Sequence, residues 1–134
     1  MTMQQRVGDD AAGFSLEFPS TGSILVTGWG FWSPEVATAF AGAVVDACRD
    51  HQQGLTLTFN MRELKPMREE GQRSFSHVLR SLPSLSTSRV SIVTTNPLTK
   101  LQLVRLATES RVEGSILWVS ETNSSNRDAG SGTI

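Results

Sequence analysis

The chain has few of the residues that carry most protein chemistry. Its 134 residues include one cysteine, two histidines and no tyrosine. A single cysteine excludes an internal disulfide and a thiolate metal cluster, and two histidines do not by themselves predict a metal site. The sequence also contains no glycine-rich phosphate loop and no Gly-x-Ser-x-Gly nucleophile elbow. We therefore expect no metal, no cofactor and no catalytic activity.

An excess of charge of one sign and long apolar runs are also missing. The formal net charge is −1, which gives no basic excess of the kind that predicts nucleic-acid binding. No apolar run approaches the roughly 18 residues that span a bilayer. The N-terminal segment "MTMQQRVGDDAAG" lacks the apolar core of a signal peptide. We expect a cytoplasmic protein that neither binds nucleic acid nor inserts into a membrane.

The patterns that are present predict an α/β domain with the element order β-β-α-β-α-β-α-β. Apolar residues in alternating or continuous runs predict strands at 13–18, 23–30, 55–61, 89–95 and 114–121. Ser33 before Pro34, and Asn96 before Pro97, are typical helix starts, and a further helix is predicted to begin near Pro66. Strands that alternate with helices imply a mostly parallel sheet of about five strands, entered through an N-terminal hairpin and packed against the helices.

The length fits one domain, which we place at residues 13–121. Residues 1–12 are expected to form a flexible arm. Residues 122–134, "TNSSNRDAGSGTI", are polar and rich in Gly and Ser, and we expect them to be disordered. An exposed edge of the first strand, 13–18, would permit a homodimer through strand pairing.

Three segments of the chain resemble the STAS domain, the SpoIIAA-like fold of anti-sigma-factor antagonists. The family's second strand, turn and first helix are similar to "SILVTGWGFWSPEVATAF", and its third strand, loop and second helix to "GLTLTFNMRELKPMREEGQRSF". Its fourth strand and third helix are similar to "RVSIVTTNPLTKLQLVRLATES". The resemblance covers roughly residues 13–121 and is strongest to an uncharacterised bacterial branch. It implies a bacterial regulatory module that acts through protein–protein interaction.

The resemblance also locates the family's phosphorylation site. Its Asp-Ser-Ser-Gly motif, whose first serine is phosphorylated by a partner kinase, aligns on Gly71 and places Glu69 at the acceptor position. Glutamate cannot accept a phosphate in this way, and its single negative charge imitates phosphoserine only crudely. A plainer role for Glu69 is to stabilise the first helical turn. Ser74 and Ser76 are weaker candidate acceptors.

An aromatic turn and a charged loop are the candidate binding segments. The turn at 28–33 carries Trp29, Phe31 and Trp32. Exposed together, these aromatics would form an interaction patch, whereas side chains turned inward would close the end of the core.

The charged loop lies in "RELKPMREEGQR", residues 62–73. Opposite charges in one segment are typical of a solvated, self-paired surface, or of a face that orients a protein partner. The candidate partner-binding residues here are Arg62, Lys65, Met67, Arg68 and Glu69.

Two functions remain open on these grounds. The first is a non-catalytic regulatory module that docks a protein partner through both segments. The alternative is a binder or carrier of a small apolar, lipid-like ligand, in a pocket near the aromatic turn walled by Trp29, Trp32, Phe40 and the second helix.

Overall fold

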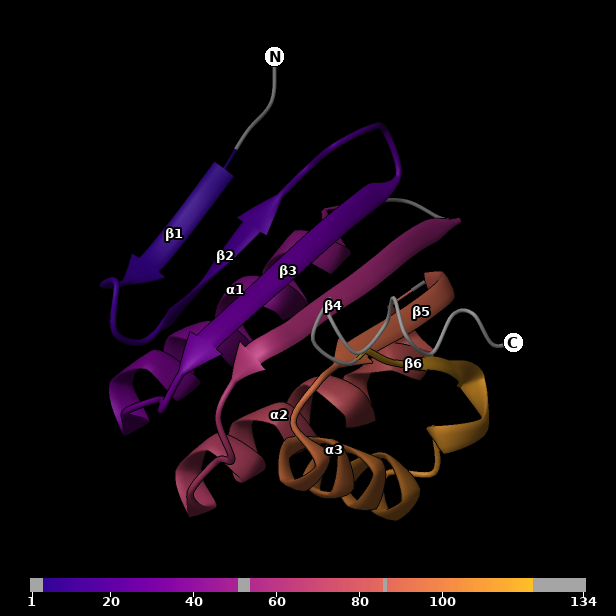
Figure 1. Cartoon of the computed structure of the whole chain (residues 1–134). Coiled ribbons are helices and arrows are strands. Elements are labelled where there is room, and N and C mark those ends of the chain that lie inside the picture. Colours follow the sequence, from indigo (N-terminus) through magenta and orange to yellow (C-terminus); the bar gives the residue numbers. More distant parts are fainter. Residues whose placement is uncertain (1–3, 51–53, 86, 122–134) are drawn as a thin grey trace, which may run out of the picture.

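The strands of the sheet lie side by side in the order in which they occur in the chain. A computed structural model describes residues 4–50, 54–85 and 87–121. The strands are β1 (Gln4–Gly8), β2 (Gly13–Glu17), β3 (Ser23–Gly30), β4 (Leu55–Leu64), β5 (Thr87–Thr94) and β6 (Ile116–Ser120). The helices are α1 (Pro34–Arg49), α2 (Glu69–Ser81) and α3 (Pro97–Glu109), with 3₁₀ turns at Leu82–Ser84 and Glu113–Ser115. The described chain is therefore an α/β fold with one six-stranded mixed sheet and three α-helices (Figure 1).

The sheet is antiparallel at its start and parallel afterwards. β1, β2 and β3 pair antiparallel, and β3, β4, β5 and β6 pair parallel. Crossovers of one hand that add strands in one direction place every connecting helix on the same face of a sheet. α1, α2 and α3 accordingly pack side by side in one layer; Figure 1 shows α1 behind β2 and β3, with α2 and α3 below the strands. The opposite face carries no helix of the described chain.

The alternation of β4 shows how the sequence distinguishes these two faces. Leu55, Leu57 and Phe59 are fully buried under the helices, while Thr56 and Thr58 between them are only half-buried. Successive side chains of a strand point to opposite faces. The apolar set therefore forms the core with the inner faces of the helices, and a threonine-rich set lies on the open face.

Two helix starts predicted from the sequence are confirmed. The Ser33 hydroxyl accepts a hydrogen bond from the Val36 amide at 3.2 Å, and α1 begins at Pro34. The Asn96 carboxamide oxygen accepts from the Leu98 amide at 2.8 Å, and α3 begins at the proline that follows. In both cases a short polar side chain satisfies backbone donors that a helix leaves unpaired.

The prediction of a helix start near Pro66 is wrong, because α2 begins at Glu69. A tertiary contact explains the difference. The Met67 amide donates to the Gln102 side-chain oxygen at 2.7 Å, and this bond from α3 holds the preceding loop outside the helix. Gly71 lies close to this loop: a Cβ there would lie 3.0 Å from the Met67 Cβ, so the Met67 side chain would have to shift by a few tenths of an ångström.

The expectation of a flexible arm over residues 1–12 is also corrected, as is the count of about five strands. Residues 4–8 form β1, which pairs with β2, so the edge of the sheet is β1 and not the 13–18 strand we proposed as a dimer edge. β1 is largely exposed and polar, which is why hydrophobic alternation did not reveal it. Residues 1–3 and the predicted disordered tail at 122–134 lie outside the described residues.

Within the described ranges, none of the helices combines the length and apolar character needed to cross a membrane.

Candidate docking surface at the carboxyl edge of the sheet

Three loops meet where β3, β4 and β5 end, and hydrogen bonds fasten them together. The Lys65 amide donates to the Gly30 carbonyl at 3.1 Å, which joins the loop after β4 to the loop after β3. The buried Thr99 hydroxyl of α3 donates to the Leu64 carbonyl at 2.9 Å. The Thr95 hydroxyl donates to the carbonyl of a β4 residue at 2.7 Å. The backbone of these loops is therefore held in place, and the side chains that project from it start from fixed positions.

Trp32 from the aromatic turn belongs to the core and not to a surface. Its side chain is 5% exposed, and its indole N–H donates to the Gly13 carbonyl at 2.8 Å. The ring lies 4.6 Å from the Phe40 ring and 6.5 Å from the Phe75 ring, centroid to centroid. Because these rings pack directly on one another, the contacts give no support to a ligand pocket between Trp32, Phe40 and α2.

Trp29 is half-buried, and its side chain already makes contacts within the chain. Its indole N–H donates to the Asp9 carbonyl at 2.8 Å, and the Arg6 guanidinium lies 4.8 Å from the centre of its ring. Trp29 thus fastens the turn between β1 and β2 to the end of β3. Two of the three aromatics proposed as binding residues are therefore structural.

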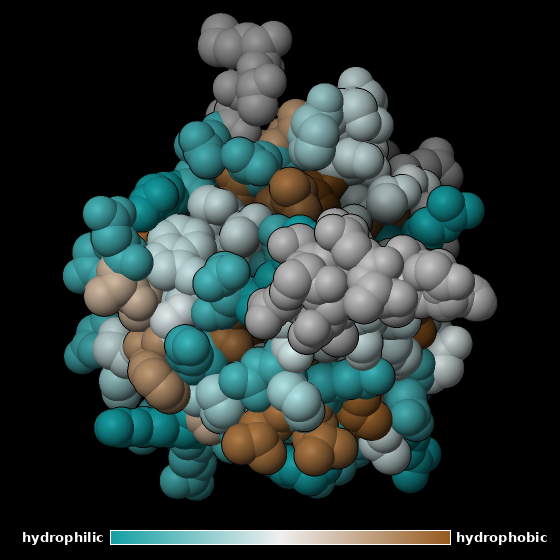
Figure 2. Space-filling view, viewed as in Figure 1, coloured by the Kyte–Doolittle hydropathy of each residue, from teal (hydrophilic) through white to brown (hydrophobic). Residues whose placement is uncertain are grey.

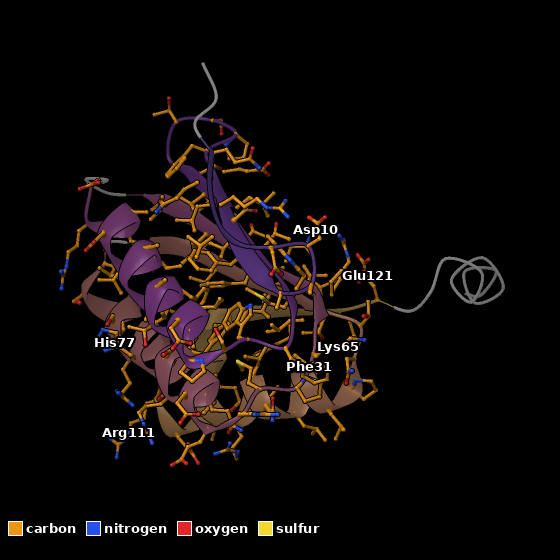
Figure 3. All side chains as sticks on the ribbon, turned by 90° about the vertical axis from the view of Figure 1, so that its left-hand side faces the viewer. Asp10, Phe31, Lys65, His77, Arg111 and Glu121 are labelled. Atoms are coloured by element: carbon orange, nitrogen blue, oxygen red, sulfur yellow. The ribbon has the colours of Figure 1, made fainter. Side chains whose placement is uncertain are left out.

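Phe31 is the member of the aromatic turn that faces solvent, with 66% of its surface exposed. Lys65 is exposed as well, and Figure 3 shows the two at the same end of the molecule, in agreement with the bond between their loops. Leu98 and Leu101 at the start of α3 are 61% and 65% exposed. Figure 2 shows hydrophobic atoms gathered along the lower edge of the view, where Figure 1 draws α3. We call Phe31, Lys65, Leu98 and Leu101 the carboxyl-edge surface.

The other candidates from the charged loop fall into two groups. Met67 is buried, with 5% of its surface exposed, and contributes to the core. Arg62 is paired within the chain: its guanidinium makes two hydrogen bonds to the Glu121 carboxylate, at 2.7 and 2.9 Å. These bonds raise the pKa of Arg62 above its usual value. Arg68 and Glu69 remain exposed at the start of α2.

Glu69 is the first residue of α2 and stays in contact with water. Its carboxylate lies 2.9 Å from the Arg73 guanidinium, and both side chains are mostly exposed. An exposed pair of this kind contributes roughly 0.3–0.5 kcal/mol. Glu69 therefore lies as an exposed acidic side chain in the first turn of α2, paired with Arg73 within the helix.

The residues of α3 that hold the loop after β4 in place were not predicted from the sequence. The Gln102 side chain both accepts from the Met67 amide and donates to the Met67 carbonyl, at 2.7 and 3.0 Å. Gln72 donates to the same carbonyl at 2.9 Å and accepts a hydrogen bond from Arg105. The available signal was a polar pair, Thr99 and Gln102, three residues apart on the helix face that packs inward.

The remaining candidates are possible metal ligands and the two serines of α2. The described part of the chain contains no group of three His, Cys, Asp or Glu residues placed to hold a metal ion. Ser76 is buried, and its hydroxyl accepts a hydrogen bond from Arg80 at 2.7 Å. Ser74 is half-buried in the same helix. Neither of these candidate phosphate acceptors lies on an open loop, where a kinase usually finds its substrate.

Cys48 provides a test of core burial on α1. Its side chain is 1% exposed, and burial raises the pKa of the thiol from 9.0 to about 11. Because only the thiolate is a good nucleophile, we expect the folded protein to react with Ellman's reagent at pH 8 roughly 100-fold more slowly than the unfolded protein. Equal rates would show that the Cys48 side chain is not buried in the core.

The same shift predicts how stability depends on pH. The unfolded thiol, with its ordinary pKa, ionises at lower pH than the folded one. The stability associated with the neutral Cys48 thiol is therefore fully present below pH 9 and is lost as the pH rises toward 11. We would measure the free energy of unfolding by urea between pH 9 and 11. Over this range it should fall less in a Cys48→Ala variant than in the parent.

Comparison with models of known protein families, with curated proteins and with solved structures gave no match.

Proposed function

We propose that this chain is a non-catalytic regulatory module that docks a partner protein through the carboxyl-edge surface. The observation that carries the proposal is the exposure of three large apolar side chains, Phe31, Leu98 and Leu101. Phe31 projects from the loop after β3, and Leu98 and Leu101 project from the start of α3. The loop after β4 is hydrogen-bonded to the end of β3, and the end of β4 to α3, so the positions of these side chains are fixed before a partner arrives. Exposed apolar groups with charged neighbours are typical of an interface with a central contact and a polar rim.

The charges beside these side chains favour a protein partner over an apolar ligand. Lys65, Arg68 and Glu69 are exposed near the same edge. Mixed charge of this kind orients an approaching protein and excludes mismatched ones. An apolar ligand would need an enclosed pocket, whereas Phe31 and Leu98 stand outward.

The sequence resemblance to STAS domains and anti-sigma-factor antagonists supports a regulatory role of this kind in the bacterial cytoplasm. In such a module, Glu69 at the acceptor position would leave docking independent of phosphorylation there. Glu69 places an acidic side chain in the first turn of α2 without any modification. We accordingly propose a constitutive binder and not a phosphorylation switch.

The proposal is tested by comparing three variants of exposed side chains in affinity capture from a lysate of the source organism. Phe31→Ser and Leu98→Ser alter the carboxyl-edge surface. The control is Leu117→Ser, which alters a β6 side chain that is 59% exposed. None of the three should change the free energy of unfolding by more than about 0.5 kcal/mol, because little burial is lost.

We expect the first two variants to reduce the recovery of one specific protein at least about tenfold, which corresponds to roughly 1.4 kcal/mol. The control should leave its recovery unchanged. If all three variants capture the same proteins in the same amounts, the carboxyl-edge surface is not the docking site.

A further inference from the structure

A pocket lies at the end of the sheet opposite to the carboxyl-edge surface. It occupies about 430 Å³ where β5 begins and where the chain leaves α3, a size within the range of small-molecule sites. Figure 3 shows Arg111 from this region well separated from Phe31. The pocket is thus independent of the proposed docking surface.

The pocket has an apolar interior and a cationic rim. Leu82, Val90 and Val112 line it and are buried. Arg89 and Arg111 line it from exposed positions, on β5 and after α3. A ligand seated here would contact aliphatic side chains at one end and two guanidinium groups at the other.

The two arginines have no acidic partner in the described part of the chain. The ion pairs found there involve Arg6, Arg62, Arg73 and Arg105. The acidic residue nearest in sequence to Arg111 is Glu113, which is exposed and forms no ion pair in that part of the chain. Two positive side chains that line one pocket both attract an anion that enters it. A guanidinium also presents paired N–H donors that match a phosphate or carboxylate.

The backbone at Arg111 gives a second, independent reason to assign its side chain a role. The Arg111 amide donates to the Thr108 carbonyl and the Val112 amide to the Ala107 carbonyl, at 3.1 and 3.0 Å. This is the Schellman motif that ends many helices, and glycine usually occupies its left-handed position. Here φ is +64° at Arg111, so an arginine is held in a conformation that favours glycine.

We propose that this pocket binds a small molecule with an anionic head group, phosphate or carboxylate, on a short apolar body. Arg89 and Arg111 bind the head group at the mouth. Leu82, Val90 and Val112 contact the body inside. The exposed Ser115 at the rim supplies a hydroxyl donor to the same anion.

The test is a titration of the full chain followed by ¹H–¹⁵N NMR, with phenyl phosphate and phenylacetate as probes and inorganic phosphate for comparison. We expect saturable shifts around residues 82, 90 and 111–115 with at least one aromatic probe. We also expect that probe to bind at least about fivefold more tightly than inorganic phosphate, because its ring is buried. A stronger response to phenyl phosphate assigns a phosphate head group, and one to phenylacetate a carboxylate. Absence of saturable shifts, or equal affinity for inorganic phosphate, would overturn the proposal.

Three arginine variants decide whether the pocket itself is responsible. Arg89→Gln and Arg111→Gln should each weaken probe binding at least about tenfold. Arg73→Gln removes the same charge from an exposed position on α2 and should leave affinity unchanged. If Arg73→Gln weakens probe binding equally, the anionic probe is attracted by positive charge anywhere on the protein, and the pocket is not the binding site.

Arg111→Gly separates a loss of ligand binding from a loss of folding. Glycine suits the left-handed position, so this variant should raise the thermal midpoint by a few degrees. It should also lower the affinity for the probe as much as Arg111→Gln does. A variant that is more stable and still binds normally would show that the Arg111 side chain has no role in the pocket.

Discussion

Replacing Trp32 by alanine should lower the free energy of unfolding by about 3–5 kcal/mol, the range found for large aromatic side chains removed from cores. This is a large share of the roughly 5–15 kcal/mol that stabilises a domain. The side chain is 5% exposed and packs on Phe40 and Phe75. Its loss also leaves the Gly13 carbonyl without the indole donor. Urea unfolding followed by circular dichroism measures the change.

Phe31 supplies the matched control for this prediction, because it is the preceding residue and is also aromatic. It is 66% exposed, so Phe31→Ala should change the free energy of unfolding by less than about 0.5 kcal/mol. Comparable losses for the two variants would mean that the turn is not oriented as described. In that case Phe31 would not be available to a partner.

Replacing Gly30 by alanine should have the second largest effect, a loss of about 3 kcal/mol. The φ angle of Gly30 is +76°, which a residue with a Cβ adopts at a penalty of roughly 1–2 kcal/mol. That Cβ would also lie 2.0 Å from the Ala11 carbonyl oxygen and 2.7 Å from the Ala12 Cα. These are backbone atoms, which yield less readily than the end of a side chain, and such overpacking adds roughly 1–3 kcal/mol.

A local readout distinguishes this strain from general destabilisation. Trp29 donates to the Asp9 carbonyl in the turn that the new methyl group would displace. Gly30→Ala should therefore change the emission of Trp29 in the folded protein, before any urea is added. Assignment requires a Trp29→Phe background, in which the change disappears.

Gly42 is the matched control for the glycine substitution. It lies exposed within α1, and a Cβ there meets no atom within 4 Å. Gly42→Ala should raise the free energy of unfolding by roughly 0.5–1 kcal/mol through helix propensity. A loss in both variants would contradict the steric argument at Gly30.

Local chemistry in the sequence was sufficient to predict most elements of the fold. Ser33 and Asn96 mark helix starts because short polar side chains before a proline satisfy exposed amides. The alternation of β4 is visible because one face of the sheet is covered. β1 could not be predicted in this way, because it is held by backbone pairing with β2 and its own side chains are largely polar and exposed.

The candidate surface was predicted only in part, and the reason lies at Gly30. In the sequence, Trp29, Phe31 and Trp32 lie together in one aromatic turn, and their spacing does not show which of them face solvent. The chain passes through the left-handed conformation of Gly30 at the end of β3, after which Phe31 faces solvent and Trp32 enters the core. The arginine pocket was not visible at all, because Leu82, Arg89 and Arg111 come from three separate segments.

The match between strand order and chain order has a consequence for how the protein folds. Each strand from β2 to β6 pairs with the strand that precedes it in the described chain, so each pairing closes at most one hairpin or one helical crossover. Folding is faster when contacting segments are close in sequence. During synthesis, each new strand would find its pairing edge already present in the nascent chain. The sheet can thus be assembled in the order of translation, without waiting for the C-terminus.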